Sequence, residues 1–258
     1  MYSTQRGSSP MMERSLMYAD KTTFNSTTSM LSKSDIIVTS LFALAITVSA
    51  MAATVYLGFI NPSITGVISM MSCGATLILG FIVFFTKKNT SSPFWTILFA
   101  ALQGITIGGF TFFIGIQTLN NGTSGWELVS QAVIGSVSVF FISFMLYACN
   151  IVRPSERMRS ILKVVFLGFL GTYAVNFLIT LFFGKNLLMS EGPLPIIIAI
   201  IAIIFGALRV ITDIQDCDYA IQSNMPQEIR WQLASSIVSS LIWLYTEILR
   251  LLYLVNRR

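Results

Sequence analysis

The sequence predicts an all-α integral membrane protein with seven transmembrane helices. Of its 258 residues, 54% are hydrophobic and only 10% are charged, and the mean hydropathy is +0.76. Soluble domains carry about 25% charged residues. Seven apolar runs each reach the roughly 20 helical residues that cross a bilayer. Short strands of alternating polarity are not seen, so we expect helices to be the elements that cross the lipid bilayer.

Turn-forming residues separate the apolar runs. The first run is too long for the apolar core of a signal peptide, which has about 7–15 residues, and is therefore interpreted as a span. We expect a flexible polar tail over residues 1–34 and a transmembrane domain over residues 35–258. The expected spans are 36–60, 64–86, 93–117, 128–151, 160–183, 194–217 and 232–255.

Lysine and arginine predict the orientation in the membrane, because they are enriched in cytoplasmic segments. They gather in the tail, in the loops after the second and fourth spans, and before the seventh span. The opposite side has Lys185 and the C-terminal pair Arg257 and Arg258. The C-terminal pair mildly opposes a cytoplasmic N-terminus, because it adds positive charge to the other side. We expect a cytoplasmic N-terminus and, with seven spans, a C-terminus on the other side.

Composition excludes several functions. Histidine is absent, so Ser-His proteases, HExxH metalloproteases and imidazole proton shuttles cannot be built from this chain. Cys73, Cys149 and Cys217 are far apart, and the sequence indicates neither a disulfide framework nor a zinc site. The excess of lysine and arginine lies in the gaps between spans. It therefore indicates how the chain is oriented in the membrane, and we expect no nucleic-acid partner. We expect no cofactor and no enzymatic activity.

A few ionisable residues lie within the spans, where a charge costs about 2.5–3.5 kcal/mol even on insertion scales, so they are candidates for function. The sixth span carries Arg209 and Asp213, and the seventh carries Glu247 and Arg250. Further candidates are charged or polar residues of neighbouring segments: Asp216, Asp218, Gln103 and Asn176. We expect Asp216 and Asp218 to support the site and the two amides to form interhelical hydrogen bonds or a polar lining.

The spacing of these charges leaves two interpretations open. Arg209 and Asp213 are four residues apart, and Glu247 and Arg250 are three apart, so each acid shares a helix face with an arginine that can neutralise it. Alternatively, Asp213 and Glu247 face each other across neighbouring helices. Two close carboxylates in a low dielectric cannot easily both ionise, so they would share a proton and form a pH-sensing latch or a cation site. They are also the Ca²⁺ candidates, although Ca²⁺ usually takes six to eight ligands.

The depth of the two acids tests the second interpretation. A turn at Asn224 to Pro226 would place Glu247 about eight residues, or roughly 12 Å, deeper in the membrane than Asp213. The mismatch disappears if residues 227–235 run along the membrane interface before turning inward. Pairing therefore requires an interfacial stretch in this segment, and without one the two acids act separately.

The last span resembles that of the Bax inhibitor-1 family, in its bacterial YccA-like branch. The motif is WLYTEILRLL at residues 243–252, which includes Glu247 and Arg250. Asp213, Pro226 and Trp231 stand at matching places upstream. Further similarity lies in SKSDIIVTS of the first span, in FAALQGITIGG of the third, and in LYACNIVRPSERMRSILKVV between the fourth and fifth.

This resemblance implies a bacterial inner-membrane protein whose last helix lies centrally, surrounded by the other six. It also implies a pH-sensitive Ca²⁺ leak in which Asp213 and Glu247 form the sensor. Glu247 stands where the wider family often has aspartate. The family arginine that engages the acid of the sixth helix has no clear equivalent, and Lys87 is the candidate for it.

Four classes of function remain open at this stage. The first is a leak for protons or Ca²⁺, and the second is a non-conducting regulator that binds membrane proteins such as the protease FtsH. The third is an intramembrane aspartyl protease, although its GxGD pattern is missing. The fourth is small-solute transport, although helices interrupted by Gly or Pro in matched halves are not evident.

Overall fold

The computed structural model describes residues 30–85, 92–119, 125–184, 186–190 and 192–256. Seven long helices of this part are apolar enough to cross a membrane, as the sequence predicts. They are α2 (Lys33–Ile60), α3 (Pro62–Phe85), α4 (Pro93–Leu119), α5 (Gly125–Ala148), α6 (Glu156–Phe183), α7 (Pro193–Gln222) and α8 (Arg230–Asn256). Two 3-10 turns, η1 (Leu187–Met189) and η2 (Gln227–Ile229), precede α7 and α8. The largest boundary difference is at α7, which continues beyond the predicted residue 217.

Local sequence explains where these helices begin and end. Asn61 closes α2 and Pro62 opens α3, because proline lacks the N–H that a helix interior needs but fits its first turn. Ser155 caps α6 by accepting a hydrogen bond from the Met158 amide. Gly184 ends α6 with a φ of 66°, a left-handed conformation that glycine adopts without strain.

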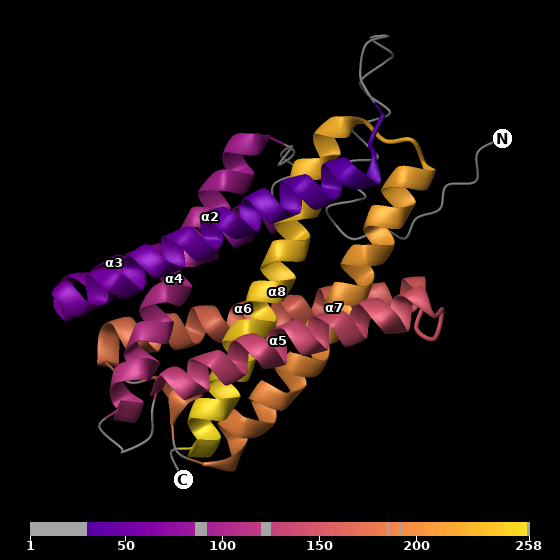
Figure 1. The fold of residues 1–258 in the computed structure, drawn as a ribbon. Coiled ribbons are helices and arrows are strands. Elements are labelled where there is room, and N and C mark those ends of the chain that lie inside the picture. The colour runs from indigo at the N-terminus through magenta and orange to yellow at the C-terminus, as the bar shows by residue number, and fades with distance from the viewer. Residues whose placement is uncertain (1–29, 86–91, 120–124, 185, 191, 257–258) are drawn as a thin grey trace.

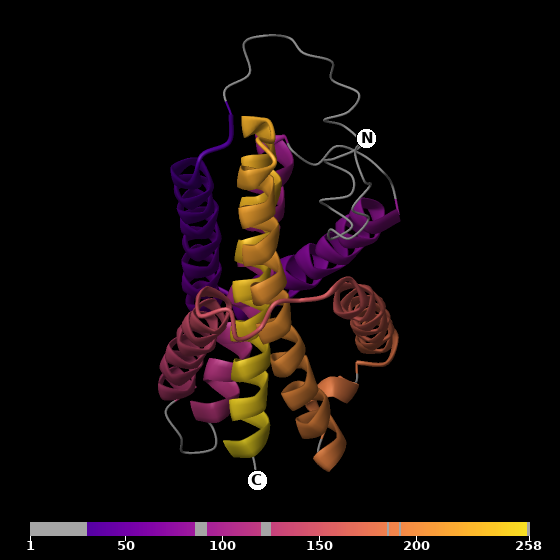
Figure 2. The ribbon, with the colours of Figure 1, turned by 90° about the vertical axis from the view of Figure 1, so that its right-hand side faces the viewer.

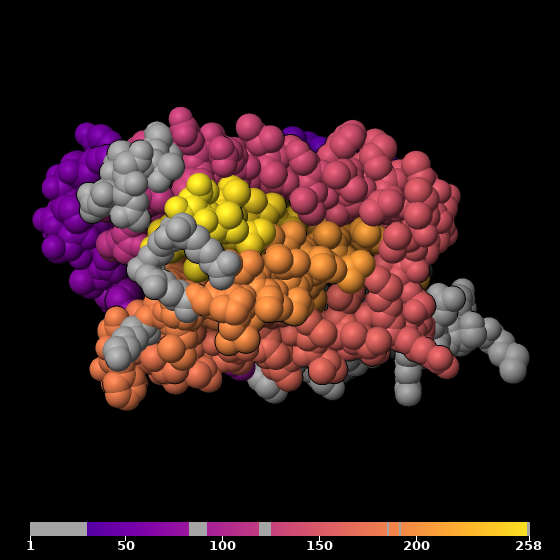
Figure 3. All heavy atoms as spheres, turned by 90° about the horizontal axis from the view of Figure 1, so that it is seen from below, coloured from indigo at the N-terminus to yellow at the C-terminus, as the bar shows by residue number. Residues whose placement is uncertain are grey.

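The last helix is central, as the resemblance implies. It packs extensively against α2, α4, α5 and α7 and is the most buried of the seven spans. In Figure 2, α7 and α8 run side by side through the middle, with α2 and α5 on one side and α6 on the other. Figure 1 shows α6 crossing behind α8, and Figure 3 shows the end of α8 between α5 and α7. The helix α3 packs mainly on α4 and α2.

Hydrogen bonds fix the register between α4 and α8. Among the described residues, four residue pairs form hydrogen bonds between the two helices, and the partners are always 134–136 residues apart in the sequence. They are Thr96 to the Trp231 carbonyl, Gln103 to Ser239, Thr111 to Tyr245, and Gln117 to Tyr253. The constant offset means that the helices run parallel, and the bonds extend over about 33 Å of helix, close to a bilayer core. A slide of α8 along α4 would break all four.

The N-terminal arm, residues 30–32, lies on the turn between α7 and α8. The Leu31 amide donates a hydrogen bond to the Met225 carbonyl at 3.1 Å, and the Leu31 side chain is buried against Met225, Ile229 and Leu233. Residues 1–29 of the predicted tail lie outside the described residues. The last two residues of the predicted tail, 33 and 34, belong to α2.

Candidate functional site

The start of α8 shows whether Asp213 and Glu247 can lie at the same depth in the membrane. The chain turns at residues 223–226, makes the single 3-10 turn η2, and enters α8 at Arg230. This described segment contains no interfacial stretch long enough to bring the two acids to one depth. Glu247 therefore remains deeper along the helix pair than Asp213, as a turn at residues 224–226 predicts. The structure gives the two acids different partners, and the prediction that they face each other as a pair is wrong for this structure.

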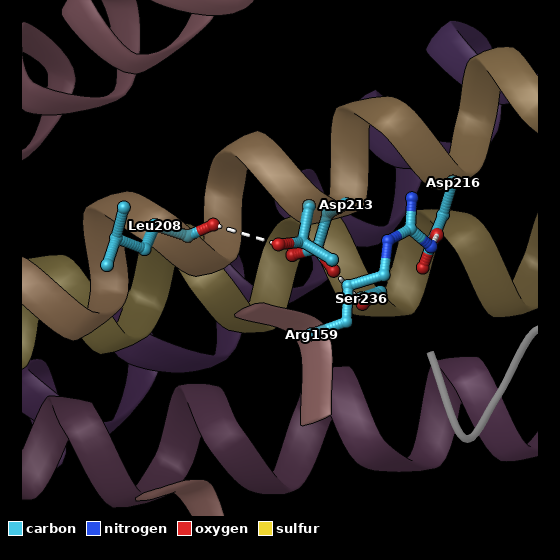
Figure 4. Close-up of polar contacts among 6 residues, drawn as sticks. Arg159, Leu208, Asp213, Asp216 and Ser236 are labelled. Carbon is cyan, nitrogen blue, oxygen red and sulfur yellow. Dashed lines mark hydrogen bonds and ion pairs between the residues drawn. The ribbon is translucent and has the colours of Figure 1, made fainter. Parts of the chain in front are cut away.

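Asp213 lies in the contact between α7 and α8. The residue is 6% exposed, and its carboxylate accepts a hydrogen bond from the Ser236 hydroxyl at 2.6 Å and another from the Ser240 hydroxyl. Figure 4 shows the Ser236 contact. The two serines stand four residues apart on α8 and therefore share one face of that helix. A buried acid on α7 thus holds two consecutive turns of α8.

Arg209 reaches Asp213 only through a serine. Its Nε donates to the Ser240 hydroxyl oxygen at 3.2 Å, and its guanidinium carbon lies 4.4 Å from the centre of the Phe166 ring. Between the described side chains of Arg209 and Asp213 no direct ion pair is found within 4 Å. The predicted neutralisation of Asp213 by the arginine of its own helix is therefore indirect.

Glu247 pairs with the arginine of its own helix. The distance from Arg250 Nη2 to Glu247 Oε2 is 2.6 Å, and Tyr173 of α6 donates its hydroxyl proton to Glu247 Oε1. The ion pair is close, yet its angles are not those of a hydrogen bond, and the Arg250 nitrogens have no acceptor of that kind among the described residues. Both charged residues are nearly inaccessible, at 2% and 3% exposed. For Glu247, the local interpretation of the sequence is the one the structure shows.

The two supporting acids of α7 engage two other helices. Arg159 of α6 forms a buried ion pair with Asp216 at 2.8 Å (Figure 4). Tyr147 of α5 donates to Asp218 at 2.7 Å. An arginine that engages an acid of the sixth span therefore exists in Arg159, which lies in the basic loop before the fifth predicted span. Lys87, the earlier candidate, lies outside the described residues.

The two predicted polar residues have different surroundings. Gln103 donates to Ser239 at 3.3 Å, an interhelical bond as expected. The Asn176 oxygen accepts the backbone amides of Leu187 and Leu188, at 3.0 and 3.3 Å, so this residue holds the η1 segment in place. Its place in a polar lining stays a prediction, and the contact with η1 was not foreseen, because the sequence does not show that the chain folds back onto the end of α6.

The charged groups form two separate centres on one face of α8. The first, at Ser236 and Ser240, holds Asp213, and the second contains Glu247 and Arg250. Ser240 and Glu247 are seven residues apart, which places them on the same face and about 10.5 Å apart along the axis. Across the described residues, no group of three or more His, Cys, Asp or Glu residues is placed to hold a metal ion.

Fold and site together define a multi-pass α-helical membrane protein with a buried acid between its last two helices. The Bax inhibitor 1 like family model matches residues 9–257, nearly the whole chain, so the chain belongs to that family. Neither the curated proteins nor the solved structures compared with it give a match.

Proposed function

We propose that this chain is a pH-sensitive cation leak and that Asp213 is the group that senses the proton. The observation that carries the proposal is the buried Asp213 carboxylate, which ties α7 to α8 through the hydroxyls of Ser236 and Ser240. Ca²⁺ is the first cation to test, because it prefers carboxylate and hydroxyl oxygens. The ion is cargo, and the proposal involves no cofactor and no enzymatic reaction.

Protonation supplies the switch. An ionised carboxylate only accepts hydrogen bonds and can take both serine hydroxyls, whereas a protonated one becomes partly a donor and accepts less. The charge that faces Asp213 is Arg209, which is linked to it through Ser240. Arg159 is already paired with Asp216. As the pH falls, protonation of Asp213 loosens α7 from α8 and the leak increases.

Glu247 has a second, different role in the proposal. Its charge is balanced by Arg250 on the same helix and bonded by Tyr173 of α6. Glu247 would give the ion a second polar contact further along α8, while Asp213 sets the pH response. Glu247→Gln is therefore expected to change the rate of the leak but not its dependence on pH.

A liposome flux assay tests the proposal. Purified protein is reconstituted with a Ca²⁺ indicator inside the vesicles, and entry is measured over a series of mildly acidic to mildly basic solutions. Asp213→Asn, which carries no charge at any pH, is expected to give a high and pH-independent rate. Glu127→Gln is the matched control, because this acid is exposed in the first turn of α5. A wild-type pH profile in Asp213→Asn, or no flux at any pH, would refute the proposal.

The setting of the leak is also a proposal. We infer a bacterial inner-membrane protein of the YccA-like branch with its N-terminus in the cytoplasm, from the WLYTEILRLL motif and the distribution of Lys and Arg. A cysteine-labelling experiment with an impermeant reagent at each end of the chain tests the orientation. Labelling of the N-terminal tail in intact cells would contradict it.

The second candidate is a non-conducting regulator that binds membrane proteins such as FtsH. The docking of Leu31 on the α7–α8 turn favours it, because a partner that holds the tail would then act on the helix pair that carries Asp213. Two results together would support it: no flux at any pH, and capture of a membrane partner that is lost when residues 1–29 are removed.

A further inference from the structure

Three aromatic rings meet where α6, α7 and α8 come together. Phe169 of α6 lies 5.4 Å from Phe205 of α7 and 5.6 Å from Trp243 of α8, measured between ring centres. Phe205 and Trp243 are 5.8 Å apart. Each helix thus contributes one ring to a closed triangle, and we call these three residues the aromatic layer.

The aromatic layer lies between the two charged centres. On α8, Trp243 stands three residues after Ser240 and four before Glu247, so all three residues share one face. Next to the layer, Phe166 lies under the Arg209 guanidinium, and Tyr173 packs edge-on against Trp243 while it bonds to Glu247. The order along this face is therefore charge, aromatic layer, charge.

The rings are held in place by their surroundings. The Trp243 indole donates to the Ala202 carbonyl at 3.1 Å, which fixes its position against α7. Gly206 permits this closeness, since a Cβ there would lie 2.8 Å from Leu244 and 3.0 Å from the Trp243 ring. Phe205 is only 4% exposed. The layer is a packed part of the structure and leaves its two sides separated.

We propose that the aromatic layer is the closed gate of the leak, an inference that rests on the proposed function. An ion or a water file that moves along this face of α8 from Asp213 to Glu247 must pass the three rings. A hydrophobic constriction stops conduction because it excludes the water that an ion needs around it. Loosening of α7 from α8 at Asp213 separates Phe205 from Trp243, and this connects the proton sensor to the gate.

Cysteine accessibility tests the gate without relying on flux. Ser240→Cys is introduced into a cysteine-free background at basic pH, where Ser236 still bonds to Asp213 and the new thiol keeps a weak donor for it. A membrane-impermeant methanethiosulfonate reagent is added on the side where α8 ends. We expect slow labelling with the intact layer and labelling about tenfold faster or more in Trp243→Ala, because the dewetted barrier is removed. Trp243→Phe keeps a ring and is expected to stay slow. Phe141→Ala, on the exposed face of α5, is the matched control.

Two variants protect the test against loss of folding. Phe169→Ala truncates the ring contributed by α6, the least buried of the seven spans, and size-exclusion chromatography in detergent checks that each protein is folded. Equal labelling of Ser240→Cys with and without the rings, in either the fast or the slow regime, overturns the gate.

Flux distinguishes the gate from the leak itself. In the liposome assay, Trp243→Ala and Phe169→Ala are expected to admit Ca²⁺ at basic pH, where the wild-type protein is closed, while Trp243→Phe stays closed. Flux in the wild-type protein with no change in the two alanine variants overturns the gate and leaves the leak standing. No flux in any variant at any pH overturns the leak, and with it the gate of that leak.

Discussion

The helix α4 lies close against α2 at Gly104. A Cβ atom added there would lie 2.4 Å from the Thr47 carbonyl oxygen and 2.7 Å from the Ala50 Cβ. Ordinary contacts of a Cβ begin near 3.4 Å, so the helices would have to separate by about 1 Å, and neither the backbone oxygen nor the Ala50 methyl group can rotate away. Overpacking of this kind costs typically 1–3 kcal/mol.

Helix propensity opposes this cost. Gly→Ala in a helix interior gains up to about 1 kcal/mol. Because the clash involves backbone, we take the upper part of the overpacking range, and Gly104→Ala is expected to lower the free energy of unfolding by about 1–2 kcal/mol. Gly168 of α6 is the matched control, since a Cβ there meets nothing within 4 Å. Gly168→Ala is expected to be neutral or slightly stabilising.

Reversible unfolding in mixed detergent micelles, followed by circular dichroism, measures both variants. The loss should appear in the stability of Gly104→Ala and not in that of Gly168→Ala. If the two variants unfold together, or if Gly104→Ala is the more stable, then close approach at Gly104 does not hold α2 against α4 and the reasoning is refuted.

Two further predictions concern single contacts. Tyr245→Phe removes the buried bond to Thr111 and is expected to cost about 1–3 kcal/mol in the same unfolding assay, because the Thr111 hydroxyl loses its partner; adding Thr111→Val should cost little more, and additive losses would contradict the bond. Leu31→Ala, at a side chain that is 5% exposed, should release the N-terminal arm and speed hydrogen exchange of the amide bonded to Met225, while Met30→Ala, at 69% exposed, should not; equal exchange in the two variants would contradict the docking.

The spans could be predicted because their length and their ends depend on neighbouring residues in the sequence. An apolar run of roughly 20 residues has only one way to satisfy its backbone in lipid, which is to form a helix. The ends follow from residues such as Pro62 and Gly184, whose backbone preferences act without help from distant contacts. The central position of α8 is predicted by the resemblance and not by the apolar pattern, since an apolar run alone does not show which helices surround it.

The buried charges could be found from the sequence, but their partners could not. Ser236 and Ser240, which hold Asp213, are small residues that occur in many membrane helices and do not stand out. Arg159 resembles a loop charge because it follows Pro154 in a basic segment. Its role depends on the first turn of α6 lying against Asp216, a tertiary contact between residues 57 positions apart.

The register of α7 and α8 could be predicted only in part, unlike the spans, which could be predicted, and the partners of the buried charges, which could not. The positions of the turn and of the two acids allowed the sequence to state a condition for pairing, namely an interfacial run over residues 227–235. They did not decide whether that condition is met. The answer depends on Arg230 beginning α8 directly after η2, next to the N-terminal arm. A packing contact of the arm thus accompanies the register of the helices that carry the acids.

The two faces of α8 have different tasks in the proposed mechanism. One face bonds to α4 at four heights, and a slide of α8 would break all of these bonds at about 1 kcal/mol each. The other face carries Ser240, Trp243 and Glu247 toward α6 and α7. In the proposed mechanism, a change at Asp213 would therefore move α7 or α6 away from a fixed α8, and not α8 along the membrane normal. The proposed leak would open by separation of helices at the aromatic layer, which is the motion that the accessibility of Ser240→Cys reports.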